Sequence, residues 1–289
     1  MGGGSWTRDS FVSYSTTVRG RGVSADGVSI GSNSVQDNFK SRMLATELDP
    51  KNVIRECVDS TEHPNTKPVI LALDVTGSMG SAAVEVAKQI NVVMTKLYEN
   101  VTDVEFLVMG IGDLAYDQAP IQASQFESDI RIAEQLDKVY FEGGGGGNAF
   151  ESYTAAWYFG LHHTKLDCWK RGQKGVIITM GDEPLNPYLP KGALSRVTGD
   201  NLQGDVETAE LYKAASEKFD IYHLNVKHGG NYYDEAIHST YGKYLDKNHF
   251  RDTSVNKIAN DIVEIVTNAF SNANVSTNVA VSSGDGISW

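Results

Sequence analysis

The chain has 289 residues, 40% of them hydrophobic, and its 25 basic and 37 acidic residues give a formal net charge of −12. This length suits one large α/β domain or two small domains. The acidic balance disfavours a protein that binds nucleic acid through a broad basic surface. The sequence contains no apolar run of ~18 residues, the length that a transmembrane helix requires.

Three features of the sequence predict a cytoplasmic protein. The two cysteines, Cys57 and Cys168, provide neither a disulfide framework nor the spacing of a metal site, so we expect buried thiols. The N-terminal residues lack the apolar core of a secretion signal. Trp6 stands where an N-acylation motif requires Ser or Thr. A reducing compartment, without membrane attachment, is the expectation.

Residues 1–66 are expected to form an N-terminal arm and an edge strand. The first 50 or so positions are polar and rich in Gly, Ser and Asn, and their basic cluster is confined to residues 19–22. This composition predicts a loosely packed arm rather than an RNA contact. A short helix is expected within residues 38–48. The alternation over residues 53–58 predicts an edge strand that precedes the central strand.

The central strand is expected at Val69–Leu73, five consecutive apolar residues that follow a proline. It ends at Asp74, whose carboxylate could not remain unpaired in an apolar core. Thr76 and Ser78 follow at intervals of two, and in an extended or turning backbone this spacing directs the three side chains to the same side. A carboxylate and two hydroxyls form a hard, oxygen-only site that suits Mg²⁺, Ca²⁺ or Mn²⁺.

Helical and strand patterns alternate along the rest of the chain. Helices are expected over residues 81–99, 128–136, 153–161, 208–219, 233–241 and 254–270, and strands over residues 104–113, 139–142, 175–183, 221–226 and 249–252. The stretch 185–205 is expected to be a long polar loop beside the metal, and residues 271–289 a flexible polar tail.

This alternation predicts an α/β fold with a doubly wound, mostly parallel central sheet and helices on both faces. Ligands of such sheets bind beyond the carboxyl ends of the strands, where the strand order reverses. Asp74, Asp113, the glycine run 143–147 and Asp182 all fall at such ends. For Asp113 we expect only a solvated turn residue.

The string Asp74-Val75-Thr76-Gly77-Ser78 resembles the metal-ion-dependent adhesion site of von Willebrand factor type A (vWA) domains. The order of the segments along the chain is also similar to that in this family: the string comes first, a second loop follows, and a later strand ends in Asp182. The resemblance covers roughly residues 67–270 and implies a Rossmann-like fold. It implies that Asp74, Thr76, Ser78 and Asp182 are metal-site residues.

The second loop departs from the usual family pattern, in which a threonine serves the metal. No threonine stands in residues 143–152, where five glycines precede Asn148 and Glu151. This arrangement resembles a bacterial or phage-type subgroup with a glycine-rich second loop followed by an acidic residue. Asn148 and Glu151 are therefore both candidate ligands, each with a helix cap as the alternative role.

The resemblance implies a binding module rather than an enzyme. Neutral hydroxyls and carboxylates acting through water would leave Mg²⁺, Ca²⁺ or Mn²⁺ with an open coordination position. An Asp or Glu of a protein partner would fill this position, and no nucleic-acid or membrane partner is expected.

Two enzyme classes stay open as alternatives. Gly144-x-Gly146-x-x-Ala149 meets a loose dinucleotide fingerprint, with Asp167 near the distance of a ribose-binding acid, which would suit a nucleotide-dependent oxidoreductase. A metal-assisted hydrolase could use the same carboxylates. The sequence contains no P-loop and no Gly-x-Ser-x-Gly elbow, and it places no nucleophile or general base. The binding module is therefore preferred.

A simpler reading makes Asp74, Thr76 and Ser78 helix-capping residues and Asp182 a loop carboxylate.

Overall fold

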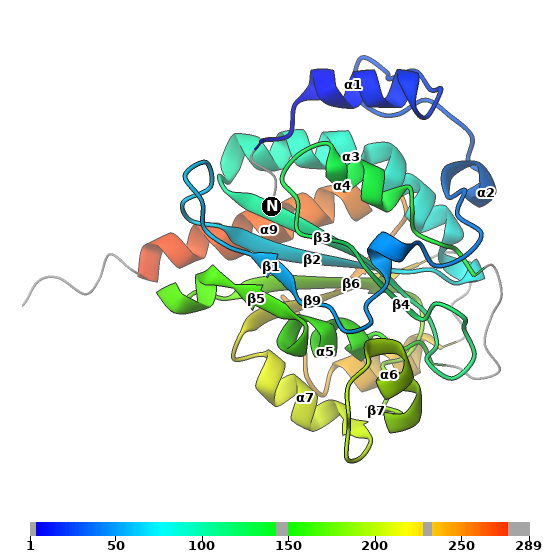
Figure 1. The fold of residues 1–289 in the computed structure, drawn as a ribbon, viewed down its shortest axis with the longest axis vertical. Coiled ribbons are helices and arrows are strands. Elements are labelled where there is room, and N and C mark those ends of the chain that lie inside the picture. The colour runs from blue at the N-terminus through cyan, green and yellow to red at the C-terminus, as the bar shows by residue number, and fades with distance from the viewer. Residues whose placement is uncertain (1–3, 143–149, 228–232, 277–289) are drawn as a thin grey trace, which may run out of the picture.

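The computed structural model describes residues 4–142, 150–227 and 233–276. Its centre is a six-stranded sheet with the strand order β10-β9-β6-β2-β3-β4 (Figure 1). Neighbouring strands are parallel except for the pair β3 and β4, which is antiparallel. The predicted mostly parallel sheet is thereby confirmed. The strands span β2 (Lys67–Asp74), β3 (Val104–Ile111), β4 (Ile121–Ala123), β6 (Gly175–Gly181), β9 (Phe219–Val226) and β10 (Phe250–Thr253).

Helices cover both faces of this sheet (Figure 1). One layer consists of α3 (Gly80–Asn100), α4 (Arg131–Leu136) and α9 (Ile258–Ser276). The opposite layer consists of α5 (Thr154–His162), α6 (Lys191–Thr198), α7 (Thr208–Ala215) and α8 (Asp234–Tyr241). No helix of the described ranges is long and apolar enough to cross a bilayer.

Strand β2 contributes to both hydrophobic cores, which explains its unbroken apolar sequence. Val69, Leu71 and Leu73 pack in the core beneath α3 and α9. Ile70 and Ala72 pack on the other face, beneath α5. Because successive strand side chains alternate between faces and both faces are buried, every position from Pro68 to Leu73 is apolar.

The strand order reverses at β2. The chain leaves β2 for β3 on one side and later returns as β6 on the other side. Leu73 lies opposite Met180 of β6 and Gly110 of β3. Asp74 and the residue after β6, Asp182, therefore meet at the crevice where ligands of doubly wound sheets bind.

The N-terminal segment is packed, contrary to the expectation of a loose arm. Trp6 and Phe11, the latter in α1 (Arg8–Thr17), belong to the same hydrophobic core as α3. Trp6 Nε1 donates a hydrogen bond to Asn91 Oδ1 at 3.0 Å. Arg19 forms a 2.7 Å ion pair with Asp137. A few large apolar residues without helical periodicity anchor this segment, so the composition concealed its packing.

Local expectations for the same region were also partly wrong. Residues 38–48 do not form one helix: α2 (Val35–Asn38) ends where this stretch begins, and the short 3-10 helix η1 (Thr46–Leu48) lies at its end. Strand β1 (Arg55–Cys57) pairs in parallel with β5 (Thr164–Leu166) and not with the central sheet. The division into residues 1–66, 67–270 and 271–289 stays a prediction, and most of the tail, 277–289, lies outside the described residues.

The stretch expected to be a polar loop, 185–205, contains regular structure. It includes strand β7 (Tyr188–Leu189), which pairs with β8 (Val206–Glu207), and helix α6. Leu189 and Leu194 are fully buried and attach the stretch to the core. The strand expected over residues 139–142 does not form. Isolated leucines among Pro and Gly give no periodic signal, which is why sequence patterns predicted a loop.

Candidate metal centre

Asp74 ends β2 as a buried carboxylate, with only 1% of its surface exposed. Its Oδ1 accepts hydrogen bonds from Thr76 N at 2.8 Å and Thr76 Oγ1 at 2.6 Å. Its Oδ2 accepts a hydrogen bond from Tyr153 OH at 2.7 Å. Burial raises the pKa of Asp74 to about 7 despite these donors. The carboxylate is therefore held in one orientation at the cost of its hydration.

The loop that follows β2 and the loop that follows β6 meet, as the sequence predicted. Ser78, in the turn that precedes α3, donates its Oγ hydrogen bond to Asp182 Oδ1 at 3.0 Å. Asp182 follows Gly181, the last residue of β6. The proximity of Asp182 contributes to the raised pKa of Asp74. Asp74, Thr76, Ser78 and Asp182 thus lie at one edge of the sheet.

Glu151 joins this group from the second loop. It forms an isolated parallel bridge with Leu185, three residues after Asp182. Its side chain is buried, and no hydrogen-bond partner of its Oε2 exists among the described residues. Burial, followed by the negative charges of Asp74 and Glu183, raises the pKa of Glu151 to about 10. Asn148, the other candidate of this loop, lies outside the described residues.

Two further carboxylates belong to the group although we did not expect them to be ligands. Asp113, after β3, is buried rather than solvated, and its Oδ2 lacks a hydrogen-bond partner in the described part of the chain. Glu183 also has a buried Oε2 with no partner there. Burial and the charges of Asp74 and Asp182 raise the pKa of Glu183 to about 7. The only sequence signal for either residue was its position at a strand end.

This set of side chains fits a hard divalent cation. It offers five carboxyl groups and two hydroxyls, and for Asp74, Asp113, Glu151 and Glu183 the described residues provide no ion pair. Buried acids without cationic partners are costly, because burial and mutual repulsion both disfavour their charged forms. An ion such as Mg²⁺, Ca²⁺ or Mn²⁺ prefers oxygen ligands and would offset this cost.

Tyr153 contacts Asp74, and Gly181 leaves space for the Tyr153 hydroxyl, although neither residue was predicted to be a ligand. Tyr153 stands at the start of α5, is 1% exposed and bonds Asp74. A Cβ atom at Gly181 would lie 2.0 Å from the Tyr153 hydroxyl oxygen, so only glycine allows this approach. Sequence reasoning missed this pair, because a single tyrosine or a strand-end glycine carries no pattern.

The proposed ribose-binding acid lies elsewhere. Asp167 accepts a hydrogen bond from Asp59 N at 3.1 Å and pairs with Lys170 at 2.6 Å. Asp59 in turn bonds Thr66, which precedes the first residue of β2. Asp167 therefore lies near the amino end of β2, whereas Asp74 ends that strand. The glycine run itself lies outside the described residues.

Comparison with known proteins shows similarity in structure without close similarity in sequence. No protein-family model and no curated protein matches the chain. Among solved structures, it is similar to the pilus adhesin SpaC from Lactobacillus rhamnosus GG in its open conformation, at 13% identity and a TM-score of 0.46. That match covers 74% of this chain and 31% of the adhesin, so the chain spans about a third of that protein.

Two other solved structures belong to the same group of matches. The vWF domain of the type V pili tip protein Mfa5 from Porphyromonas gingivalis is 12% identical, with a TM-score of 0.44. That match covers 75% of this chain and 98% of the domain. The PilB minor pilin from Streptococcus sanguinis is 12% identical over 71% of this chain and 62% of the pilin, with a TM-score of 0.44. At this similarity, the assignments below depend on the side chains of the chain itself.

The expectation of a cytoplasmic location is wrong in light of these matches. The similar structures are a pilus adhesin, a pilus tip protein and a minor pilin, and pili lie outside the cell. The expectation relied on two cysteines and on the residues at the N-terminus, and neither feature reports directly on where a folded domain works.

Proposed function

We propose that this protein is a metal-dependent binding module of the vWA type, not an enzyme. Asp74, Thr76, Ser78, Asp182 and Glu151 would hold one Mg²⁺, with Ca²⁺ or Mn²⁺ as substitutes. The observation that carries the proposal is the buried Oε2 of Glu151, unpartnered among the described residues, in a group of carboxylates at the strand-order reversal. Asn148, with no described position, stays a candidate ligand.

The two hydroxyls are suited to act as neutral ligands. Thr76 Oγ1 and Ser78 Oγ each donate their single hydrogen to a carboxylate, which leaves their lone pairs available to a cation. A bound cation would supply an electrophilic position for a carboxylate from outside the chain. Because the chain carries a net charge of −12, an acidic partner is repelled at long range, and the cation must provide the attraction locally.

The metal is tested by thermal unfolding of the EDTA-stripped full chain with and without Mg²⁺ or Mn²⁺. A ligand that binds only the native state stabilises it by about 2.7 kcal/mol at 100 times its Kd. Asp74→Ala and Glu151→Gln should abolish the shift. Asp220→Ala, which removes a carboxylate paired with Lys174 at 3.4 Å, should retain it. A shift that survives in Asp74→Ala would refute the site.

The partner's carboxylate is tested by pull-down in Mg²⁺, in EDTA and with Ser78→Asp. The added carboxylate in Ser78→Asp should keep the cation bound but occupy or neutralise the position that the partner needs. A partner that stays bound in EDTA and to Ser78→Asp would refute recognition through the metal. The metal experiment would still decide, independently, whether the cation itself binds.

A further inference from the structure

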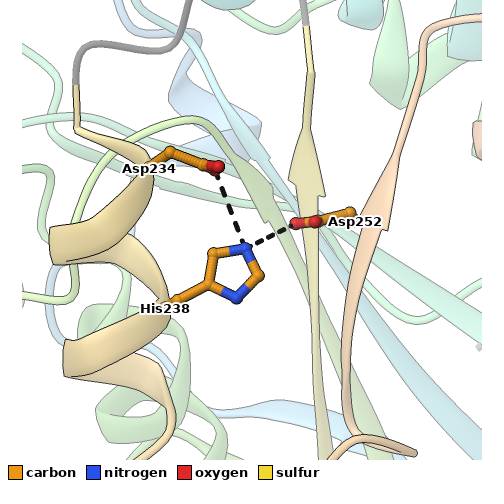
Figure 2. Close-up of side chains that lie close together, drawn as sticks. All are labelled: Asp234, His238 and Asp252. Carbon is orange, nitrogen blue, oxygen red and sulfur yellow. Dashed lines mark ion pairs between the residues drawn. The ribbon is translucent and has the colours of Figure 1, made fainter.

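A second group of side chains that could bind a metal lies at the β10 edge of the sheet. Asp234 and His238 stand one turn apart on α8, and Asp252 is on the edge strand β10 (Figure 2). One carboxylate oxygen of each aspartate and a ring nitrogen of His238 all lie within 4.8 Å of one another. In Figure 2 both carboxylates are directed at the same nitrogen of the imidazole.

The distances suit a small tetrahedral ion. His238 Nε2 lies 3.1 Å from Asp252 Oδ1 and 3.7 Å from Asp234 Oδ1. Zinc bonds to nitrogen and oxygen of ~2.0–2.1 Å place two tetrahedral ligands ~3.3 Å apart. The measured separations bracket this value, so an ion could enter with small side-chain adjustments.

Neighbouring residues orient the ligands. Asn225, fully buried on β9, donates from Nδ2 to Asp252 Oδ1 at 2.8 Å, and its Oδ1 has no hydrogen-bond partner in the described part of the chain. The His238 ring meets Phe250 edge-on with ring centroids 5.0 Å apart. Such outer contacts fix the orientation of metal ligands.

A cation already occupies the space between the carboxylates. The Lys227 ammonium forms ion pairs with Asp234 and, at 3.5 Å, with Asp252. The two aspartates therefore converge on a position that accepts positive charge. His238 and Asp252 also line a cavity of about 350 Å³ together with Leu245 and Phe250.

We propose that Asp234, His238 and Asp252 bind one Zn²⁺. An imidazole with two carboxylates favours zinc over Mg²⁺ or Ca²⁺, which prefer oxygen alone. Three protein ligands leave the fourth position open towards the cavity, where a water molecule or an external donor binds. Zinc displaces the Lys227 ammonium. The competing reading is an exposed ion-pair network without a metal, and such networks contribute little to stability.

The test uses the full chain in the Asp74→Ala background, so that the first site does not contribute. The protein is stripped with EDTA and titrated with Co²⁺, followed by visible absorption, and with Zn²⁺, followed by calorimetry. One equivalent of Co²⁺ should give the intense bands of tetrahedral coordination, and Zn²⁺ should remove them. His238→Ala and Asp252→Asn should lose both signals while circular dichroism confirms that they fold.

Two more variants separate a built site from surface binding. His249 contacts a single aspartate, Asp246, at 2.8 Å, so His249→Ala is the matched control and should bind zinc like its parent. Lys227→Met removes the competing ammonium and should tighten zinc binding by about tenfold, the scale of outer-shell changes. Absence of tetrahedral Co²⁺ bands in the parent, or equal zinc binding by His238→Ala and His249→Ala, would overturn the proposal.

Discussion

At the scale of single residues, the hydroxyl of Tyr153 should support the proposed metal centre by orienting Asp74. It donates to Asp74 Oδ2 at 2.7 Å inside the core. Tyr153→Phe leaves a buried carboxylate oxygen without this donor, which costs ~1–3 kcal/mol of unfolding free energy. Because Asp74 is then less well oriented, Mg²⁺ should also bind more weakly. Urea unfolding with and without Mg²⁺ measures both effects.

The matched control for this change lies on the same helix. Tyr158 OH donates to Asp200 Oδ2 at 2.6 Å, again a tyrosine–aspartate bond, but in a partly buried position. Tyr158→Phe should change the stability less and leave the Mg²⁺ response unchanged. Equal losses of Mg²⁺ response in Tyr153→Phe and Tyr158→Phe would show that Tyr153 has no special role at the proposed metal centre.

His223 should make the stability depend on pH. It is fully buried on β9, where burial lowers its pKa to about 3. The groups packed against it are uncharged. Thr179 Oγ1 lies 2.8 Å from its Nδ1, and the Tyr241 ring stacks on the imidazole with ring centroids 3.9 Å apart. The rings of Tyr153 and Phe250 also contact it. Below pH ~6.5 His223 binds a proton in the unfolded chain but stays neutral in the folded chain. The free energy of unfolding therefore falls as the pH decreases.

The expected loss from His223 is about 2 kcal/mol between pH 7 and pH 5. Asp74 and Glu183 act in the opposite direction, because their raised pKa values stabilise the fold at low pH and this stability is lost as the pH rises. Comparing wild type with His223→Gln by urea unfolding at both pH values isolates the histidine. Identical pH dependence in the two proteins would contradict the assignment.

At the scale of elements, helix α6 should behave as part of the core and not as a dispensable loop. Leu194 is fully buried, whereas Arg196 is exposed on the same helix. Leu194→Ala should cost ~2–5 kcal/mol of unfolding free energy. Arg196→Ala should stay within ~0.5 kcal/mol of wild type. Chemical denaturation measures both, and a neutral Leu194→Ala would mean that this stretch is not packed in solution.

The N-terminal helix α1 provides the corresponding test at the other layer. Phe11 is fully buried against the core beneath α3, and Val18, which directly follows the last residue of α1, is 64% exposed. Phe11→Ala should destabilise the whole domain by ~3–5 kcal/mol in a single cooperative transition. Val18→Ala is the control and should be close to neutral. A separate early transition in Phe11→Ala would instead indicate an independent arm.

At the scale of the whole molecule, the two proposed metal sites should act independently. Asp74 ends β2 and Asp252 lies on β10, and β6 and β9 stand between these strands. Three strand spacings of ~4.8 Å separate them by roughly 14 Å, beyond the range at which neighbouring sites usually couple. Stabilisation by Mg²⁺ and by Zn²⁺ should therefore add.

Thermal unfolding of four proteins measures this independence: wild type, Asp74→Ala, His238→Ala and the double variant. Each single variant should lose the response to one metal only, and the double variant should respond to neither. A loss of both responses in one single variant would show that the two groups of side chains form a single site.

The sequence alone determined the fold class and which side chains meet at the centre of the first proposed site, because both depend on local patterns. Apolar runs located the central strands, and helical spacing located the helices between them. The residues that directly follow the parallel strands of such a sheet all lie at the same edge. Asp74, Thr76 and Ser78 lie within five positions, and Asp182 follows a strand, so their convergence could be expected before the structure was known.

Only the tertiary structure decided which other groups gather around them. Whether Asp113 and Glu183 face the site or the solvent depends on the strand order and on packing, which no single segment encodes. Asp252 meets Asp234 and His238 because β10 pairs with β9 and α8 covers that edge. The anchoring of α1 and α6 likewise depends on isolated apolar side chains. The burial of these side chains depends on residues far away in the sequence. Such contacts leave no periodic pattern in the sequence from which burial could be predicted.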